Sequence, residues 1–167
     1  MIVVDTNVIV YCWTHGERRA EAQRLRSLDP MWHVPLIWRS EFRNVLCGYV
    51  RRGALSLDSA QEIRAVVEGA LCGREHVIAG AAVLDMALHT GLSGYDAEFV
   101  VLAEALGAPL VTEDREMLSA YAGAISIKDF LARAQDGPPS VHSPRAAYQT
   151  GMFSRVKRPT RAPSRLS

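Results

Sequence analysis

Residues 2–11 read IVVDTNVIVY, a β-branched run that one acidic residue interrupts. The segment Ile2-Val3-Val4 is short and apolar, which is typical of a strand buried on both faces. Asp5 follows it directly, and Asp114 comes shortly after a second strand-like run, Leu110-Val111-Thr112. Open α/β sheets bind their ligands outside the carboxyl ends of parallel strands. Both aspartates are therefore expected at an edge of the sheet where a ligand binds.

Strand-like runs alternate with helix-like segments through the first 135 residues. The strands are predicted at 2–4, 32–34, 76–78, 110–112 and 124–127, and the helices at 7–14, 17–28, 36–52, 58–71, 81–89, 96–106, 115–121 and 128–134. This alternation predicts an α/β fold in which helices cover both faces of a parallel sheet.

The composition changes at Asp136. Residues 1–135 carry 17 acidic and 13 basic residues, a net charge of −4, whereas residues 136–167 carry one acidic and six basic residues, a net charge of +5. The second segment is rich in Pro, Ser and Arg and shows no apolar periodicity. Such a composition cannot build a core. We therefore predict a folded domain over 1–135 and a flexible, mostly disordered basic tail over 136–167.

The start of the chain and its cysteines predict a cytoplasmic protein. The first residues lack the basic region of a signal peptide, and no apolar stretch approaches the roughly 20 residues that cross a bilayer. Three cysteines, Cys12, Cys47 and Cys72, lack CxxC spacing, and each lies among apolar residues. They are predicted to be buried, reduced thiols.

Two more acidic residues are expected near the same edge. Glu41 borders the apolar face of the helix at 36–52, and Asp96 opens the helix at 96–106. Two ionised carboxylates about 4 Å apart repel by roughly 4 kcal/mol at an effective dielectric near 20. Divalent cations remove this cost, and carboxylates with few His or Cys suit Mg²⁺ or Mn²⁺. Each residue also has an ordinary alternative: the aspartates can cap helices, and Glu41 can be a surface residue.

Several neighbours could support such a site. Thr6 and Asn7 are expected to cap the first helix and orient the Asp5 carboxylate, and Thr112 could donate to a ligand carboxylate or a water. Arg39 and Arg43 flank Glu41, where they could contact substrate phosphates or simply cover the surface. Two further acidic residues lie near the candidates in the sequence. Glu98 lies about 160° around its helix from Asp96 and is predicted to be solvated, and Glu113 competes with Asp114.

Two segments, IVVDTNVIVY at 2–11 and SGYDAEFVVLAEALGAPLVTEDREML at 93–118, resemble a PIN-domain ribonuclease when they are taken together with Glu41. The resemblance is strongest to the VapC-type toxins of prokaryotic toxin–antitoxin pairs, and it covers about residues 1–133. It implies a PIN-like nuclease domain that cuts RNA endonucleolytically with Mg²⁺ or Mn²⁺, forms homodimers and is inhibited by a small antitoxin. It also implies which residues are the metal ligands and catalytic residues, namely Asp5, Glu41, Asp96 and Asp114.

Other classes of protein stay open. A phosphotransfer or phosphatase domain could use Asp5 as a nucleophile, although Asn7 stands where a haloacid-dehalogenase-like enzyme would need a second Asp. A nucleotide-binding domain is disfavoured because no GxxxxGK[ST] or GxGxxG motif follows a strand. A PIN-fold interaction module without catalytic activity is the third alternative.

Overall fold

Five parallel strands form a single sheet in the computed structural model, which describes residues 1–135. The strands are β1 (Ile2–Val4), β2 (Trp32–Pro35), β3 (Glu75–His76), β4 (Leu110–Val111) and β5 (Ala124–Ile125). Their order across the sheet is β3-β2-β1-β4-β5. The central strand pairs with β2 through Ile2 and Trp32 and with β4 through Val3 and Leu110. The predicted tail, 136–167, lies outside the described residues.

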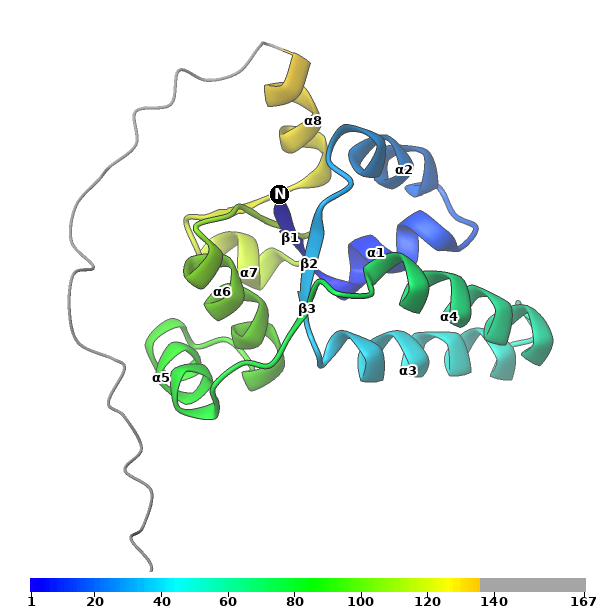
Figure 1. Ribbon diagram of the computed structural model, residues 1–167, viewed down its shortest axis with the longest axis horizontal. Helices are drawn as coiled ribbons and strands as arrows, with labels where there is room; N and C mark the ends of the chain where they lie inside the picture. Colours follow the sequence, from blue (N-terminus) through cyan, green and yellow to red (C-terminus); the bar gives the residue numbers. More distant parts are fainter. Residues whose placement is uncertain (136–167) are drawn as a thin grey trace, which may run out of the picture.

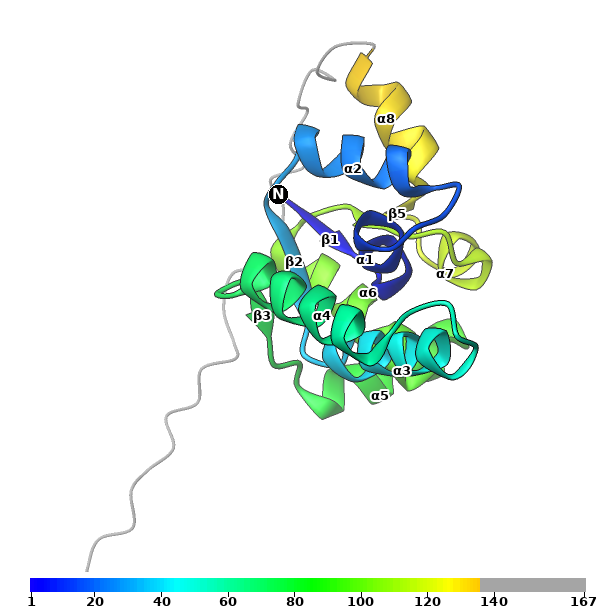
Figure 2. The same cartoon turned by 90° about the vertical axis from the view of Figure 1, so that its right-hand side faces the viewer.

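Helices cover both faces of this sheet, as predicted. They are α1 (Thr6–Trp13), α2 (Arg19–Leu28), α3 (Trp38–Arg51), α4 (Leu57–Leu71), α5 (Gly80–Thr90), α6 (Gly94–Leu106), α7 (Arg115–Ala120) and α8 (Ile127–Gln135). Figure 1 shows α1 to α4 on one side of the strands and α5 and α6 on the other. Turned by 90°, Figure 2 shows α3 and α4 side by side below α1, with α8 packed against α2.

The core forms around β1, whose three residues are almost completely buried. Burial on both faces explains why this strand is a continuous apolar run instead of an alternating one. Phe99 and Val100 of α6 are fully buried, and α6 contacts β1, β2 and β4. Gly107 ends α6 with a φ of 58°, a left-handed conformation that glycine adopts without strain. The chain can then turn directly into β4, which leads to Thr112 and Asp114.

Most elements lie within about two residues of their predicted bounds, and the differences have local causes. The strand predicted at 76–78 forms at Glu75–His76 instead, and Val77 is 84% exposed. The helix predicted at 96–106 begins at Gly94, because the Ser93 hydroxyl accepts a capping hydrogen bond from the Asp96 N–H. No helix among residues 1–135 is both long and apolar enough to cross a membrane.

The cysteine prediction is wrong for two of the three residues. Cys12 is buried and its thiol pKa is raised by burial to about 11, whereas Cys47 and Cys72 are exposed. The apolar neighbours of Cys47 turn toward the core on other faces of α3, and Cys72 lies at the end of α4. Apolar sequence neighbours therefore did not establish burial of the cysteine itself.

Candidate active site

Asp5 connects the end of β1 to the start of α1. Its backbone N–H donates to the carbonyl of Val111, which fixes it beside β4. Its side chain makes no helix-capping hydrogen bond. Instead, Oδ2 accepts from the Thr112 hydroxyl at 2.8 Å and from the Asn7 amide at 3.3 Å. The carboxylate is thus held over the edge of the sheet and is not used to cap the helix.

Burial makes the Asp5 carboxylate costly to ionise. The residue is only 4% exposed, and burial raises its pKa from 3.8 to about 6. The Thr112 hydroxyl and the N–H groups of Thr6 and Asn7 lower the pKa, and the negative charge of Asp96 raises it further. Among residues 1–135, no ion pair reaches this side chain.

Glu41 lies in the first turn of α3, half-buried beside the start of α1. Its Oε2 accepts a hydrogen bond from the Thr6 hydroxyl at 2.5 Å, so Thr6 orients Glu41, whereas Asn7 contacts Asp5. Burial raises the pKa of Glu41 most, the Thr6 hydrogen bond lowers it, and the charges of Asp5 and Asp96 raise it again. The charges of Asp5 and Asp96 both act on Glu41, and we refer to Asp5, Glu41 and Asp96 together as the acidic cluster.

Asp96 enters this cluster from the first turn of α6, on the opposite side of the sheet from α3. Ser93 is the N-cap residue of this helix, and its hydroxyl donates to Asp96 Oδ2 at 2.6 Å. Glu98 also lies close enough to raise the pKa of Glu41, and its own pKa is raised by burial. Glu98 is neither fully exposed nor fully buried, so the expectation of a solvated residue holds only in part.

Asp114 is joined to the cluster through a hydroxyl. Its backbone N–H donates to Thr112 Oγ1 at 2.9 Å, and that hydroxyl donates to Asp5. Its own Oδ1 accepts from the N–H groups of Glu116 and Met117 at 2.8 and 2.9 Å, so that Asp114 caps α7. The capping role, predicted as the ordinary alternative, is present. The rival Glu113 accepts from the Ile127 N–H at 2.9 Å and pairs with Arg18, so it holds α8 and the α1–α2 loop.

The acidic cluster has the donor chemistry that a hard divalent cation requires. Within the described residues, no three His, Cys, Asp or Glu side chains already stand close enough to hold a metal ion. However, the cluster offers only oxygen ligands, and no Lys or Arg of residues 1–135 forms an ion pair with them. Mg²⁺ needs only one or two protein carboxylates and completes its shell with waters and phosphate oxygens. The residues present therefore fit such an ion.

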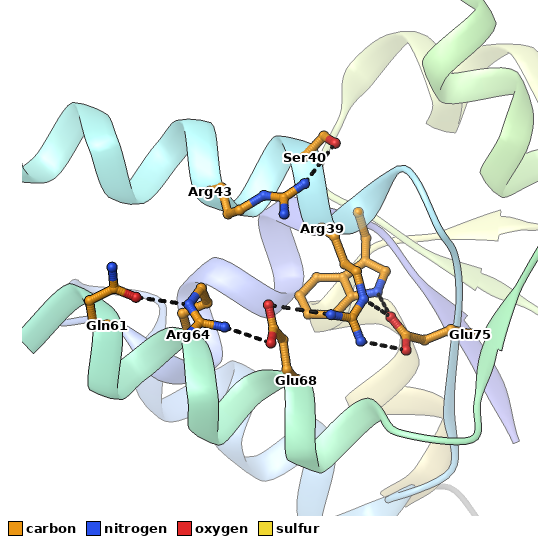
Figure 3. Close-up of polar contacts among 8 residues, drawn as sticks. Arg39, Ser40, Arg43, Gln61, Arg64, Glu68 and Glu75 are labelled. Atoms are coloured by element: carbon orange, nitrogen blue, oxygen red, sulfur yellow. Dashed lines mark hydrogen bonds and ion pairs between the residues drawn. The ribbon is translucent and has the colours of Figure 1, made fainter.

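The structure does not bring Arg39 to the acidic cluster. Its Nε and Nη2 donate to the two carboxylate oxygens of Glu75 at 2.6 and 2.8 Å, and Nη1 lies 3.4 Å from Glu68. Trp38 Nε1 also donates to Glu75 at 2.7 Å. Figure 3 shows these contacts between α3, α4 and β3, with Arg43 nearby and donating to Ser40. Arg39 thus stabilises the packing of α3 against β3, and Arg43 stays exposed.

An apolar groove lies between α3 and α4. Its volume is about 460 Å³. The lining residues are Arg43, Leu46, Cys47, Val50, Arg51, Leu57, Ala60, Gln61, Arg64 and Glu68. This α3–α4 groove combines an apolar floor with three arginines, and the sequence did not predict it.

Comparison with known proteins assigns the family. Residues 2–123 match the PIN domain, and the chain belongs to the PIN domain family. Ribonuclease VapC3 of Pyrobaculum aerophilum is 29% identical over 128 residues, which are 75% of this chain and 98% of that protein. Exonuclease VapC9 of the same organism is 45% identical over 51 residues, which are 30% of this chain and 38% of the relative.

Two solved structures share the fold. The crystal structure of PAE2754 from Pyrobaculum aerophilum superposes with a TM-score of 0.63 at 24% identity, covering 81% of this chain and 89% of that one. A toxin–antitoxin complex from Klebsiella pneumoniae gives a TM-score of 0.54 at 18% identity and covers 76% and 98%. These likenesses confirm the predicted PIN-like fold.

Proposed function

We propose that this protein is a divalent-metal-dependent endoribonuclease and the toxin of a type II toxin–antitoxin pair. The observation that carries the proposal is the buried Asp5 carboxylate, on which the charge of Asp96 acts and which itself acts on Glu41; among residues 1–135 it has no ion-pair partner. Membership of the PIN family and relatives named ribonuclease and exonuclease support nuclease chemistry. A cytoplasmic location, where RNA is available, is part of the proposal.

The residues around the cluster would hold Mg²⁺ or Mn²⁺ and align the RNA phosphate. Asp5, Glu41 and Asp96 are the proposed ligands, and Asp114 would act from the adjacent turn. When bound, a divalent ion supplies Lewis acidity to the scissile phosphate and makes water a stronger acid. Each carboxylate of the cluster is already oriented by a hydroxyl, from Thr112, Thr6 and Ser93 respectively. Such hydrogen bonds restrict carboxylate rotation, so less reorganisation accompanies binding.

The direct experiment compares RNA cleavage by wild type, Asp5→Asn and a matched control, Asp58→Asn. Asp58 is an exposed aspartate of α4. A circular single-stranded RNA serves as substrate, because only an endonuclease can open it. We expect wild type and Asp58→Asn to open the circular RNA in the presence of Mg²⁺ or Mn²⁺, and their cleavage to stop in EDTA. Asp5→Asn should be inactive under both conditions. Equal cleavage by Asp5→Asn, or undiminished cleavage in EDTA, would overturn the proposal.

A small antitoxin is the proposed protein partner, by analogy with the Klebsiella pneumoniae complex. The α3–α4 groove offers an apolar floor next to Arg43, Arg51 and Arg64, which suits an amphipathic segment with acidic residues. Expression of the chain alone should arrest growth, and co-expression of the antitoxin encoded beside it should restore growth. A homodimer is also proposed, and light scattering would measure it. Harmless expression of folded wild type would contradict the toxin assignment.

A non-catalytic PIN-fold interaction module is the second candidate. The observation that favours it is the lack of three preassembled ligands among residues 1–135. Such a module would bind its protein partner normally and leave the circular RNA intact at any metal concentration.

A further inference from the structure

A small cavity lies beside the end of α1, apart from the α3–α4 groove. Its volume is about 240 Å³. It is lined by Tyr11, Thr14, His15, Gly16, Glu17, Arg18, Arg19 and Tyr49. The walls therefore come from α1, from the loop that leads to α2, from the first residue of α2 and from the second half of α3. Two aromatic rings and two guanidinium groups share this small volume.

The aromatic rings are already stacked with cations. The Arg18 guanidinium carbon lies 5.5 Å from the centre of the Tyr11 ring, and that of Arg52 lies 5.3 Å from the Tyr49 ring. Aromatic rings combined with arginine are the surfaces on which proteins stack the bases of single-stranded nucleic acids. The cavity has this chemistry, whereas the floor of the α3–α4 groove is largely aliphatic.

A short chain of contacts connects this cavity to the acidic cluster. Arg18 pairs with Glu113. The residue before Glu113 is Thr112, whose hydroxyl donates to Asp5 at 2.8 Å. The charges of both Glu113 and Asp5 also reach the Tyr11 phenol and add to the effect of burial in raising its pKa.

We propose that this cavity binds one unpaired base of the RNA substrate, stacked on Tyr11 and Tyr49, next to the phosphate held at the acidic cluster. The volume limits the ligand, because drug-sized molecules occupy pockets of about 300–1,000 Å³. A single ring fits the 240 Å³ available. Arg18, which is exposed, lies at the rim, where it can exchange Glu113 for a phosphate of the same strand. The site would fix the position of cleavage relative to an unpaired base, and this inference rests on the proposed function.

Binding to RNA with and without bases tests the proposal. The full chain carrying Asp5→Asn, which prevents cleavage, is titrated with fluorescein-labelled 12-nucleotide oligouridine and oligoadenosine and with a 12-unit abasic ribose-phosphate strand. Tyr11→Leu keeps apolar bulk but removes the ring, and Tyr11→Phe keeps the ring. We expect Tyr11→Leu to weaken binding of at least one base-containing strand about 5- to 100-fold, and Tyr11→Phe to bind like the parent. Binding of the abasic strand should not change.

Two outcomes would overturn the base site. One is unchanged affinity of Tyr11→Leu for both base-containing strands, and the other is an equal loss for the abasic strand, which would indicate a purely electrostatic surface. Unchanged binding of the abasic strand shows that Tyr11→Leu is folded, and Tyr11→Phe shows that the ring and not the hydroxyl is required. Cleavage assays in the Asp5-containing protein separate the two proposals. If wild type cuts RNA with metal and Tyr11→Leu keeps the same KM and cut positions, only the base site fails.

Discussion

Replacing Asp5 by Asn should stabilise the metal-free protein at neutral pH. The Asp5 pKa rises from 3.8 to about 6 on folding, and this gap corresponds to about 3 kcal/mol, since each pKa unit is worth roughly 1.4 kcal/mol. A carboxyl whose pKa is higher in the folded than in the unfolded state stabilises the fold fully below pH 3.8. This stabilisation is lost as the pH rises through about 6. Asn has nearly the same shape, and its Oδ1 can still accept from Thr112. The variant therefore keeps the hydrogen bond and removes the buried charge.

Thermal unfolding in EDTA, followed by circular dichroism from pH 4 to pH 8, measures this effect. The difference in Tm between Asp5→Asn and wild type should grow across this range to about 10 °C, given a few degrees per kcal/mol for a domain of this size. Asp58→Asn, which changes an exposed aspartate, should follow wild type at every pH. The reasoning would be refuted if Asp5→Asn were less stable than wild type at pH 8, or if the difference did not depend on pH.

Three other perturbations give distinct results. Glu75→Gln should lower the unfolding free energy by about 1 kcal/mol, because it weakens the hydrogen bonds to Arg39 and Trp38. RNA cleavage should be unaffected. Chemical denaturation measures the first effect and the circular-RNA assay the second. Burial and the neighbouring His76 lower the pKa of His33 below 6.5. The stability that neutral His33 provides is therefore present above pH 6.5 and is lost as the pH falls from there through the lowered pKa. His33→Gln should flatten this acidic limb of the Tm profile, and an unchanged limb would contradict the assignment. Ending the chain after Gln135 should leave Tm nearly unchanged, because the buried cluster of the described residues already spans Ile2 to Leu131 and the sequence of 136–167 has no apolar periodicity. An aggregated product would show that the domain boundary is wrong.

The position of Asp5 could be predicted because it depends on local information. A short β-branched run followed by an acidic residue specifies a buried strand and its carboxyl end, and parallel pairing then brings β4 alongside. The positions of Glu41 and Asp96 followed from the same topology, since both lie in the first turns of helices that follow strands or loops at this edge. The fold and the approximate position of the site therefore needed no knowledge of individual contacts.

Side-chain partners from distant parts of the chain could not be predicted in this way. Arg39 is adjacent to the site in sequence, yet it binds Glu75, which is 36 residues away. The Thr6 hydroxyl, expected to orient Asp5, donates to Glu41, 35 residues away, whereas the Thr6 backbone N–H acts on Asp5. The partial burial of Glu98 could not be predicted either, because the wheel of one helix carries no information about its neighbour. The α1 cavity with Tyr11 and Tyr49 likewise depends on how α1 and α3 pack.

The most direct test of the metal site is calorimetric titration of Mn²⁺ into the metal-free full chain. Wild type should bind Mn²⁺, because an ion removes the repulsion among three partly buried carboxylates that no basic residue of the described chain neutralises. Asp5→Asn and Asp96→Asn should each weaken this binding at least tenfold, and Asp58→Asn should bind like wild type. Absence of Mn²⁺ binding by wild type, or equal binding by Asp5→Asn, would contradict the assignment of the acidic cluster as a metal site.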